Sequence, residues 1–148
     1  MDESAYREAR AAINPAPCIF EKALLAGNAV CELARRHAVA ERETVECTSA
    51  VARTNCQTLA GLFRERATFA LRLPPPGNAL PHAAAMKLQC GGLLGLRRAL
   101  GASQSDVHRM VVEAQRRWST LLDLPWPEVV GVIAAWQIRR RHQGESRQ

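Results

Sequence analysis

Five cysteines are the residues of this 148-residue chain whose chemistry is most suggestive. Thiolates bind zinc, Cu(I) and iron–sulfur clusters. The gaps between successive cysteines are 12, 15, 8 and 33 residues, in the order Cys18, Cys31, Cys47, Cys56 and Cys90. The closely paired C-x₂₋₄-C spacing of structural zinc sites is missing, as is compact ferredoxin spacing. Dispersed ligands favour an iron–sulfur cluster held between helices, and zinc or copper fits this spacing less well.

Apolar periodicity and proline breaks predict an all-α fold, a compact single-domain bundle of five to six helices. Alanine and leucine dominate, and no stretch alternates apolar and polar residues for long enough to predict a strand. The prolines after residue 13 and after residue 73 end two helices, because proline disfavours helical geometry around it. The predicted helices cover residues 3–13, 18–40, 50–71, 80–100, 103–121 and 128–141.

An antiparallel hairpin of the second and third predicted helices is expected at the centre of the bundle, over residues 18–71. Both apolar stripes contain a cysteine, and at 1.5 Å rise per residue Cys31 and Cys56 fall at nearly the same level. Cys90 lies on the apolar face of the helix over 80–100. We therefore expect Cys31, Cys56 and Cys90 to converge as ligands.

A fourth ligand has to come from Cys18 or Cys47. In straight helices each of these lies about 20 Å or more from Cys31 along the axis. Either one joins the site only if a helix is broken, and Gly27–Asn28 is the candidate position for a break.

Core packing is the alternative explanation of the cysteines, because small apolar thiols fill tight helix contacts. The chain would then be a non-enzymatic helical interaction or regulatory protein. With a cluster, it would serve electron transfer, sensing or cofactor assembly. No nucleophile elbow, phosphate-binding loop or zinc-protease motif is present, so the sequence favours a protein that is not an enzyme.

Two adjacent glycines interrupt the helix predicted over residues 80–100. Gly91 and Gly92 each cost a helix interior about 1 kcal/mol relative to alanine. A helix that accepts this cost needs close backbone approach, or is bent at that point.

The positive charge is concentrated at one end of the chain. The formal net charge is +6, and half of this excess lies in the last ten residues. Arg139, Arg140 and Arg141 are candidates for contact with an anionic partner. We expect residues 1–141 to form a single helical domain and residues 142–148 a disordered basic tail. Aromatic residues make up only 5%, which gives nucleic acid weak support as a partner and favours another protein.

Composition places the chain among cytoplasmic globular proteins. Hydrophobic residues make up 47%, which is too many for a disordered chain. No apolar run approaches the roughly 18 to 20 residues of a membrane helix, and the acidic first residues lack the apolar region of a signal peptide. We therefore expect a cytoplasmic protein without membrane contact, in which disulfides are disfavoured.

Overall fold

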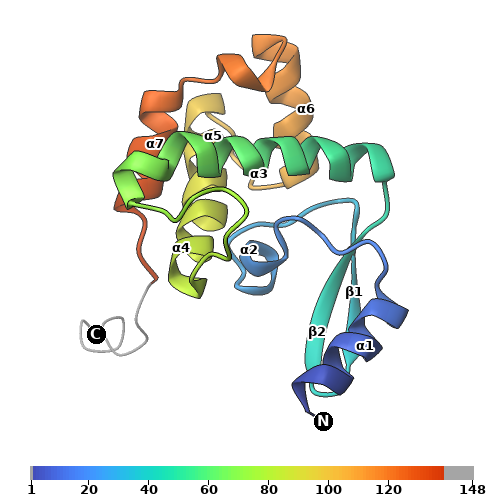
Figure 1. Cartoon of the computed structure of the whole chain (residues 1–148). Coiled ribbons are helices and arrows are strands. Elements are labelled where there is room, and N and C mark those ends of the chain that lie inside the picture. The colour runs from blue at the N-terminus through green and yellow to red at the C-terminus, as the bar shows by residue number, and fades with distance from the viewer. Residues whose placement is uncertain (1, 139–148) are drawn as a thin grey trace, which may run out of the picture.

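Helices make up most of the structure, a computed structural model that describes residues 2–138 (Figure 1). One antiparallel pair of strands, β1 (Ala34–Val39) and β2 (Arg42–Cys47), interrupts them. The helical elements are α1 (Glu3–Ile13), α2 (Glu21–Leu25), α3 (Ala50–Leu71), α4 (His82–Met86), the π-helical turn η1 (Lys87–Gly91), α5 (Gly92–Leu100), α6 (Val107–Trp118), the 3₁₀ turn η2 (Leu121–Asp123) and α7 (Trp126–Ala135). The prediction of a mainly helical fold is confirmed, with a small sheet added.

Side-chain caps begin the longer helices. Asp2 accepts the Ala5 N–H at 2.7 Å, and Ser49 accepts the Ala52 N–H at 3.2 Å. Such caps satisfy backbone donors that have no partner inside the helix. As a result α1 and α3 match the predicted ranges 3–13 and 50–71.

Within residues 2–138, no helix combines the length and apolar character that crossing a bilayer demands.

The start of α6 differs from the prediction by four residues. Asp106 caps it by accepting the Arg109 N–H at 3.1 Å. The chain enters the helix only after Asp106, because Val30 pairs with this segment: Val30 N–H donates to Ser105 O at 3.1 Å, and Val107 N–H donates to Val30 O at 2.8 Å. The last helix also differs, since α7 ends at Ala135.

The predicted helix over residues 18–40 is wrong. Only α2 is helical there, and Gly27 follows it with φ +78°, a conformation that glycine adopts without strain. The chain then returns as the β1–β2 hairpin, with Ala34 opposite Cys47 and Val39 opposite Arg42. The proposed central helix hairpin of residues 18–71 is therefore also wrong, and its first half consists of the short helix α2, a loop and a strand pair.

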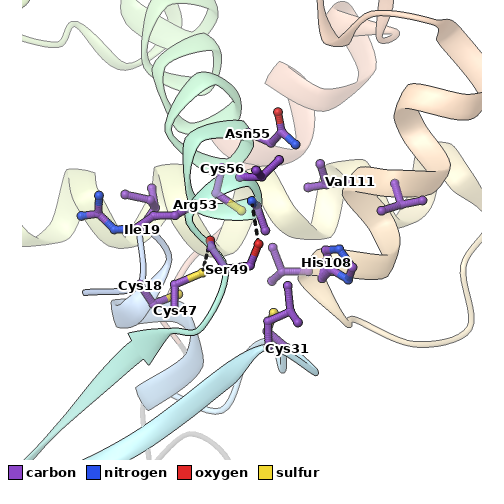
Figure 2. A pocket seen from close by; sticks show the side chains of 15 residues that line it. Cys18, Ile19, Cys31, Cys47, Ser49, Arg53, Asn55, Cys56, His108 and Val111 are labelled. Atoms are coloured by element: carbon purple, nitrogen blue, oxygen red, sulfur yellow. Dashed lines mark hydrogen bonds between the residues drawn. The ribbon is translucent and has the colours of Figure 1, made fainter. Parts of the chain in front are cut away.

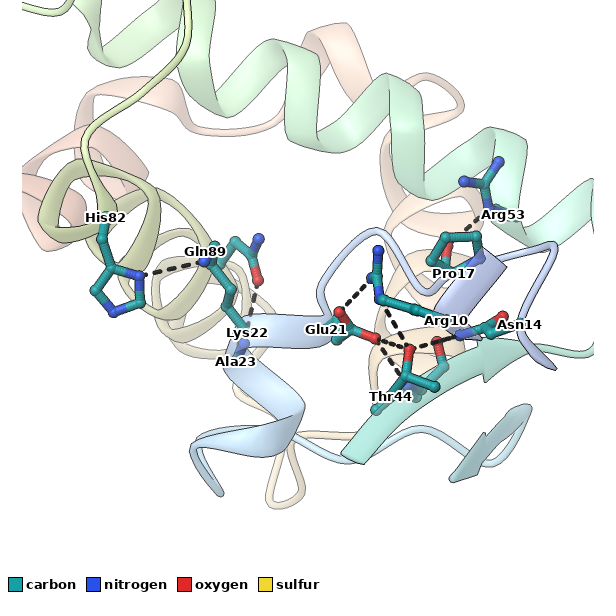
Figure 3. Close-up of polar contacts among 11 residues, drawn as sticks. Arg10, Asn14, Pro17, Glu21, Lys22, Ala23, Thr44, Arg53, His82 and Gln89 are labelled. Atoms are coloured by element: carbon teal, nitrogen blue, oxygen red, sulfur yellow. Dashed lines mark hydrogen bonds and ion pairs between the residues drawn. The ribbon is translucent and has the colours of Figure 1, made fainter. Parts of the chain in front are cut away.

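The β1–β2 hairpin extends from the helical body, with α1 lying beside it (Figure 1). Glu21 of α2 fastens it through hydrogen bonds from the Val45 N–H and the Thr44 hydroxyl, both at 2.7 Å (Figure 3). The same carboxylate pairs with Arg10 at 2.6 Å. Asn14 Nδ2 donates to Val45 O at 2.8 Å. These buried polar contacts fix β2 against the start of α2.

Aromatic side chains form the centre of the core. The Phe63 ring of α3 lies 6.0 Å from the rings of both Phe20 and Trp126. Gly92 packs directly on Phe63, where a Cβ atom would lie 2.3 Å from the ring. Gly91 lies close to α7, with 2.8 Å from its ideal Cβ position to the Ile133 Cα. The adjacent glycines therefore permit close approach, which is one of the two alternatives that the sequence left open.

Substituting Gly92 by alanine should destabilise the fold. The added methyl group would collide with a fully packed phenylalanine, and overpacking of this kind costs about 1 to 3 kcal/mol. Gly61→Ala is the matched control, because Gly61 is exposed in α3 with open space around it. Helix propensity predicts that this control raises the unfolding free energy by about 0.5 to 1 kcal/mol. Urea denaturation of both variants measures the difference, and equal stabilities would contradict the packing description.

Candidate metal centre

Four of the five cysteines line one cavity of about 230 Å³ (Figure 2). Cys18 precedes α2, Cys31 lies in the loop between α2 and β1, Cys47 ends β2, and Cys56 lies in the second turn of α3. All four are partly buried free thiols. Four separate segments therefore contribute a cysteine to the wall of one cavity.

Backbone pairing brings Cys18 and Cys47 together. The Cys18 N–H donates to Val45 O at 2.8 Å, and the Cys47 N–H donates to Ala16 O at 2.9 Å. Pro17 and Glu46 face each other as an antiparallel bridge between these bonds. Residues 16–18 thus act as a short third strand along the end of β2.

Cys31 reaches the cavity through a different set of contacts. Val30, the preceding residue, pairs with the chain just before α6, so Cys31 lies beside the start of that helix. Burial raises the pKa of the Cys31 thiol, and the backbone N–H groups of Leu33 and His108 partly oppose this rise. His108 is itself oriented by Glu32, whose carboxylate lies 2.7 Å from Nδ1.

Cys56 is placed by the start of α3. Arg53, one turn before it, donates from Nε to Pro17 O at 2.8 Å. This bond holds the first turns of α3 against the segment that carries Cys18 (Figure 3). The Cys47 thiol lies against the same helix start and donates to Ser49 O at 3.2 Å.

The cysteines that line the cavity differ from the predicted ligands: Cys90 is missing, and both Cys18 and Cys47 are present. Cys31 and Cys56 line the same cavity, although the facing helices predicted to bring them together are not formed. Cys90 does not line this cavity: it is 3% exposed and belongs to the hydrophobic core. The expected layer of Cys31, Cys56 and Cys90 is absent because Cys31 lies in a loop and not on a helix facing η1. Arg139, Arg140 and Arg141 lie outside the described residues.

Burial disfavours the charged form of these thiols. It raises the pKa of Cys18 to about 11 and that of Cys56 to about 12, and the neighbouring thiols add repulsion between like charges. Burial also raises the pKa of Cys31. At neutral pH these three groups are therefore protonated unless a positively charged species compensates their thiolates.

The start of α3 supplies part of that compensation. Ser49 and Ala52 line the cavity there, and α3 has no acidic residue in its first turn. The positive end of this helix dipole therefore favours an anionic group in the cavity. Val107 and His108 bring the start of α6 to the same cavity, but the Asp106 carboxylate that caps α6 offsets its dipole and raises the pKa of Cys31.

Apolar side chains make up much of the remaining wall, and they include Ile19, Leu33, Val107 and Val111. Such a wall limits the access of water and tunes the properties of a bound metal group. Among residues 2–138, no three histidine, cysteine or carboxylate side chains are grouped tightly enough to hold a single metal ion. The thiols are instead distributed around the cavity.

The stability of the metal-free, reduced protein should depend on pH in a defined window. Because the folded thiols have pKa values raised from an ordinary value near 9 to about 11 or 12, unfolding releases their protons between those values. The thiols' stabilising contribution is therefore complete below about pH 9 and is lost as the pH rises toward 11 and beyond. Urea denaturation at pH 8, 9 and 10.5 should show falling stability, with a shallower fall in Cys56→Ser. A constant or rising stability would contradict the burial of these thiols.

Comparisons with known proteins give no assignment: no protein-family model, no curated protein and no solved structure matches the chain.

Proposed function

We propose that this protein binds an iron–sulfur cluster, with Cys18, Cys31, Cys47 and Cys56 as its ligands. The observation that carries the proposal is that four thiols from four segments line one cavity. Four cysteine thiolates are the complete ligand set of both [2Fe–2S] and [4Fe–4S] clusters. The cluster would lie where α3, α6, the end of β2 and the loops around α2 meet, and it would cross-link these segments.

The dimensions of the cavity favour a cluster over a single zinc ion. Tetrahedral zinc with bonds of about 2.3 Å draws its four sulfur atoms to within about 3.8 Å of one another. Here the thiols surround a space of about 230 Å³, larger than an apolar cavity of roughly 150 Å³ that accommodates benzene. A cluster of iron and sulfide ions occupies more space than one zinc ion. Its cysteine ligands bind different iron atoms, so their sulfur atoms lie farther apart than those around zinc.

Electrostatics also support a cluster with iron at its centre. The raised pKa values of Cys18 and Cys56 show that thiolates are costly in this cavity without a cation. Iron replaces the thiol protons and removes the repulsion, so binding releases protons. The backbone N–H group of Phe20 partly opposes the rise in the pKa of Cys18, and those of Leu33 and His108 do the same for Cys31. Hydrogen bonds from such groups to ligand sulfurs are one of the means by which proteins set cluster potentials.

Single substitutions of the five cysteines by alanine should separate ligands from core packing. We expect the parent protein, purified without oxygen, to contain iron and acid-labile sulfide and to absorb visible light. Cys18→Ala, Cys31→Ala, Cys47→Ala and Cys56→Ala should each lose most of both elements, because each removes one of four ligands. Cys90→Ala is the control, since it removes a buried thiol outside the cavity and should keep the full metal content.

Elemental analysis of the same five variants decides between the alternatives. A parent protein without iron, zinc or copper would contradict metal binding and favour the interaction protein with cysteines as packing. A parent protein with one equivalent of zinc and no sulfide would contradict the cluster and indicate a site for a single zinc ion. Loss of iron in Cys90→Ala, with retention in Cys18→Ala or Cys47→Ala, would contradict the ligand set.

A further inference from the structure

The outward face of α3 carries two large apolar side chains that the rest of residues 2–138 leaves open to solvent. Phe69 is 97% exposed, and Val51 is 74% exposed. The opposite face of the helix packs on the core through Leu59, Leu62, Phe63 and Ala67. In Figure 1, α3 runs along the outside of the helical body. Phenylalanine is enriched at contacts between proteins, so an almost fully exposed phenylalanine on this face indicates a binding surface.

The outward face of α3 carries little charge. Its exposed residues between Val51 and Phe69 are Thr54, Gln57, Thr58, Gly61, Glu65 and Arg66. The guanidinium group of Arg66 lies 5.6 Å from the centre of the Trp126 ring, which places it on the side of α3 that faces α7. Glu65 is therefore the charged group that remains on the outward face, all of whose residues the structure describes.

The two other arginines of α3 also turn away from this face. Arg53 donates from Nε to Pro17 O at 2.8 Å. Arg64 donates from Nη2 to backbone oxygens of the loop after α3, among them Asn78 O at 2.8 Å. Both side chains thus bind neighbouring segments of their own chain.

Val51, Phe69 and Gly61 are spaced so that the face is complementary to itself. Val51 and Phe69 are 18 residues apart, which is five complete turns at 3.6 residues per turn, so they lie on one line along the helix. The midpoint between them is residue 60. Gly61, next to this midpoint, is exposed, and nothing lies within 4 Å of its ideal Cβ position.

We propose that a second copy of this chain packs antiparallel against α3, with a twofold axis beside Gly61. Such an axis places Phe69 of each copy against Val51 of the other, because both residues lie nine positions from the midpoint and on the same edge of the face. The same contact is made twice, as in any twofold-symmetric dimer. A partner of different sequence would not require this symmetric spacing. The contact involves no bound metal group, so this inference is independent of the cluster proposed above.

Sterics and charge are compatible with this arrangement. Packed helix axes lie about 8 to 10 Å apart, and glycine at the crossing point permits the closer distances. At 1.5 Å rise per residue the two copies of Glu65 lie about 15 Å apart along the helix axes. This separation exceeds the screening length of about 8 Å at physiological ionic strength, so their repulsion is weak.

The size of the contact predicts a weak, reversible dimer. α3 has 22 residues, a length of about 33 Å. Two helix faces of this length bury less than the roughly 1,200 Å² at which stable complexes begin. Phe69 supplies the largest apolar area of any residue on the face, so the affinity should depend on it.

Sedimentation equilibrium from about 10 to about 500 µM protein tests the dimer. The average mass of the parent should rise with concentration from that of a monomer toward that of a dimer. Phe69→Gln should raise the dissociation constant at least tenfold, because each dimer loses two buried aromatic rings, and at 97% exposure this change leaves the fold intact. Leu25→Gln is the matched control: Leu25 is an exposed leucine in α2, outside the α3 face. Its dissociation constant should stay within twofold of the parent's.

Disulfide cross-linking tests the position of the twofold axis. In Gly61→Cys the two new thiols meet beside the axis, and oxidised glutathione should join them into one disulfide while it is itself reduced to two glutathione thiols. Thr54→Cys is the control on the same face. Its two copies lie about 18 Å apart along the helix axes, and cysteines whose Cα atoms are more than about 7 Å apart do not form a disulfide. Non-reducing gels should show covalent dimer for Gly61→Cys, and none for Thr54→Cys or the parent.

Three results would overturn the proposal. A parent that is monomeric at every concentration would exclude the second copy and leave the face to a different partner. Equal dissociation constants for Phe69→Gln and the parent would place any dimer contact elsewhere on the surface. Cross-linking of Thr54→Cys as fast as Gly61→Cys would contradict the antiparallel arrangement around Gly61.

Discussion

Two backbone hydrogen bonds hold two of the cysteine-bearing segments of the cavity side by side. They join the Cys18 N–H to Val45 O and the Cys47 N–H to Ala16 O, at 2.8 and 2.9 Å. Because of them, a segment that precedes α2 runs beside the end of β2, and two cysteines 29 positions apart meet. The Glu21 carboxylate secures this arrangement from the other side by accepting the Val45 N–H. The remaining thiols are then supplied by the loop before β1 and by α3.

Two of the four thiols around the cavity are costly to ionise, because burial and the neighbouring thiols raise the pKa values of Cys18 and Cys56. Core cysteines usually behave as small apolar groups in close contact, and Cys90, at 3% exposure, fits that description. The other four line a cavity, and the start of α3 lies there as well. An arrangement that gathers thiols whose ionisation needs a compensating cation is suited to a metal-centred group. This contrast between Cys90 and the other four is the physical basis of the proposed function.

The sequence predicted the helices that carry their own boundary signals. The prolines after α1 and α3, and the caps Asp2 and Ser49, act over a few residues and can be read directly. The stripe of small apolar residues over 18–40 was misleading, because helix and irregular core segments share such residues. The hairpin turn also lacked its usual Asn-Gly or Asp-Gly signal, since Ala40 takes the positive φ of 54°. The candidate site was therefore anticipated only in part: the cysteines as a group, with Cys31 and Cys56 near each other. The positions of Cys18 and Cys47 depend on long-range backbone pairing, which residue spacing does not encode.

Anomalous X-ray diffraction at the iron edge, on crystals of protein purified without oxygen, tests the central claim most directly. The cluster account predicts strong anomalous density inside the cavity, within bonding distance of the Cys18, Cys31, Cys47 and Cys56 sulfurs, with a second set of peaks from sulfide. Two results would contradict a cluster in this cavity. One is the absence of an iron signal there, with the thiols packed against one another, and the other is iron bound beside Cys90.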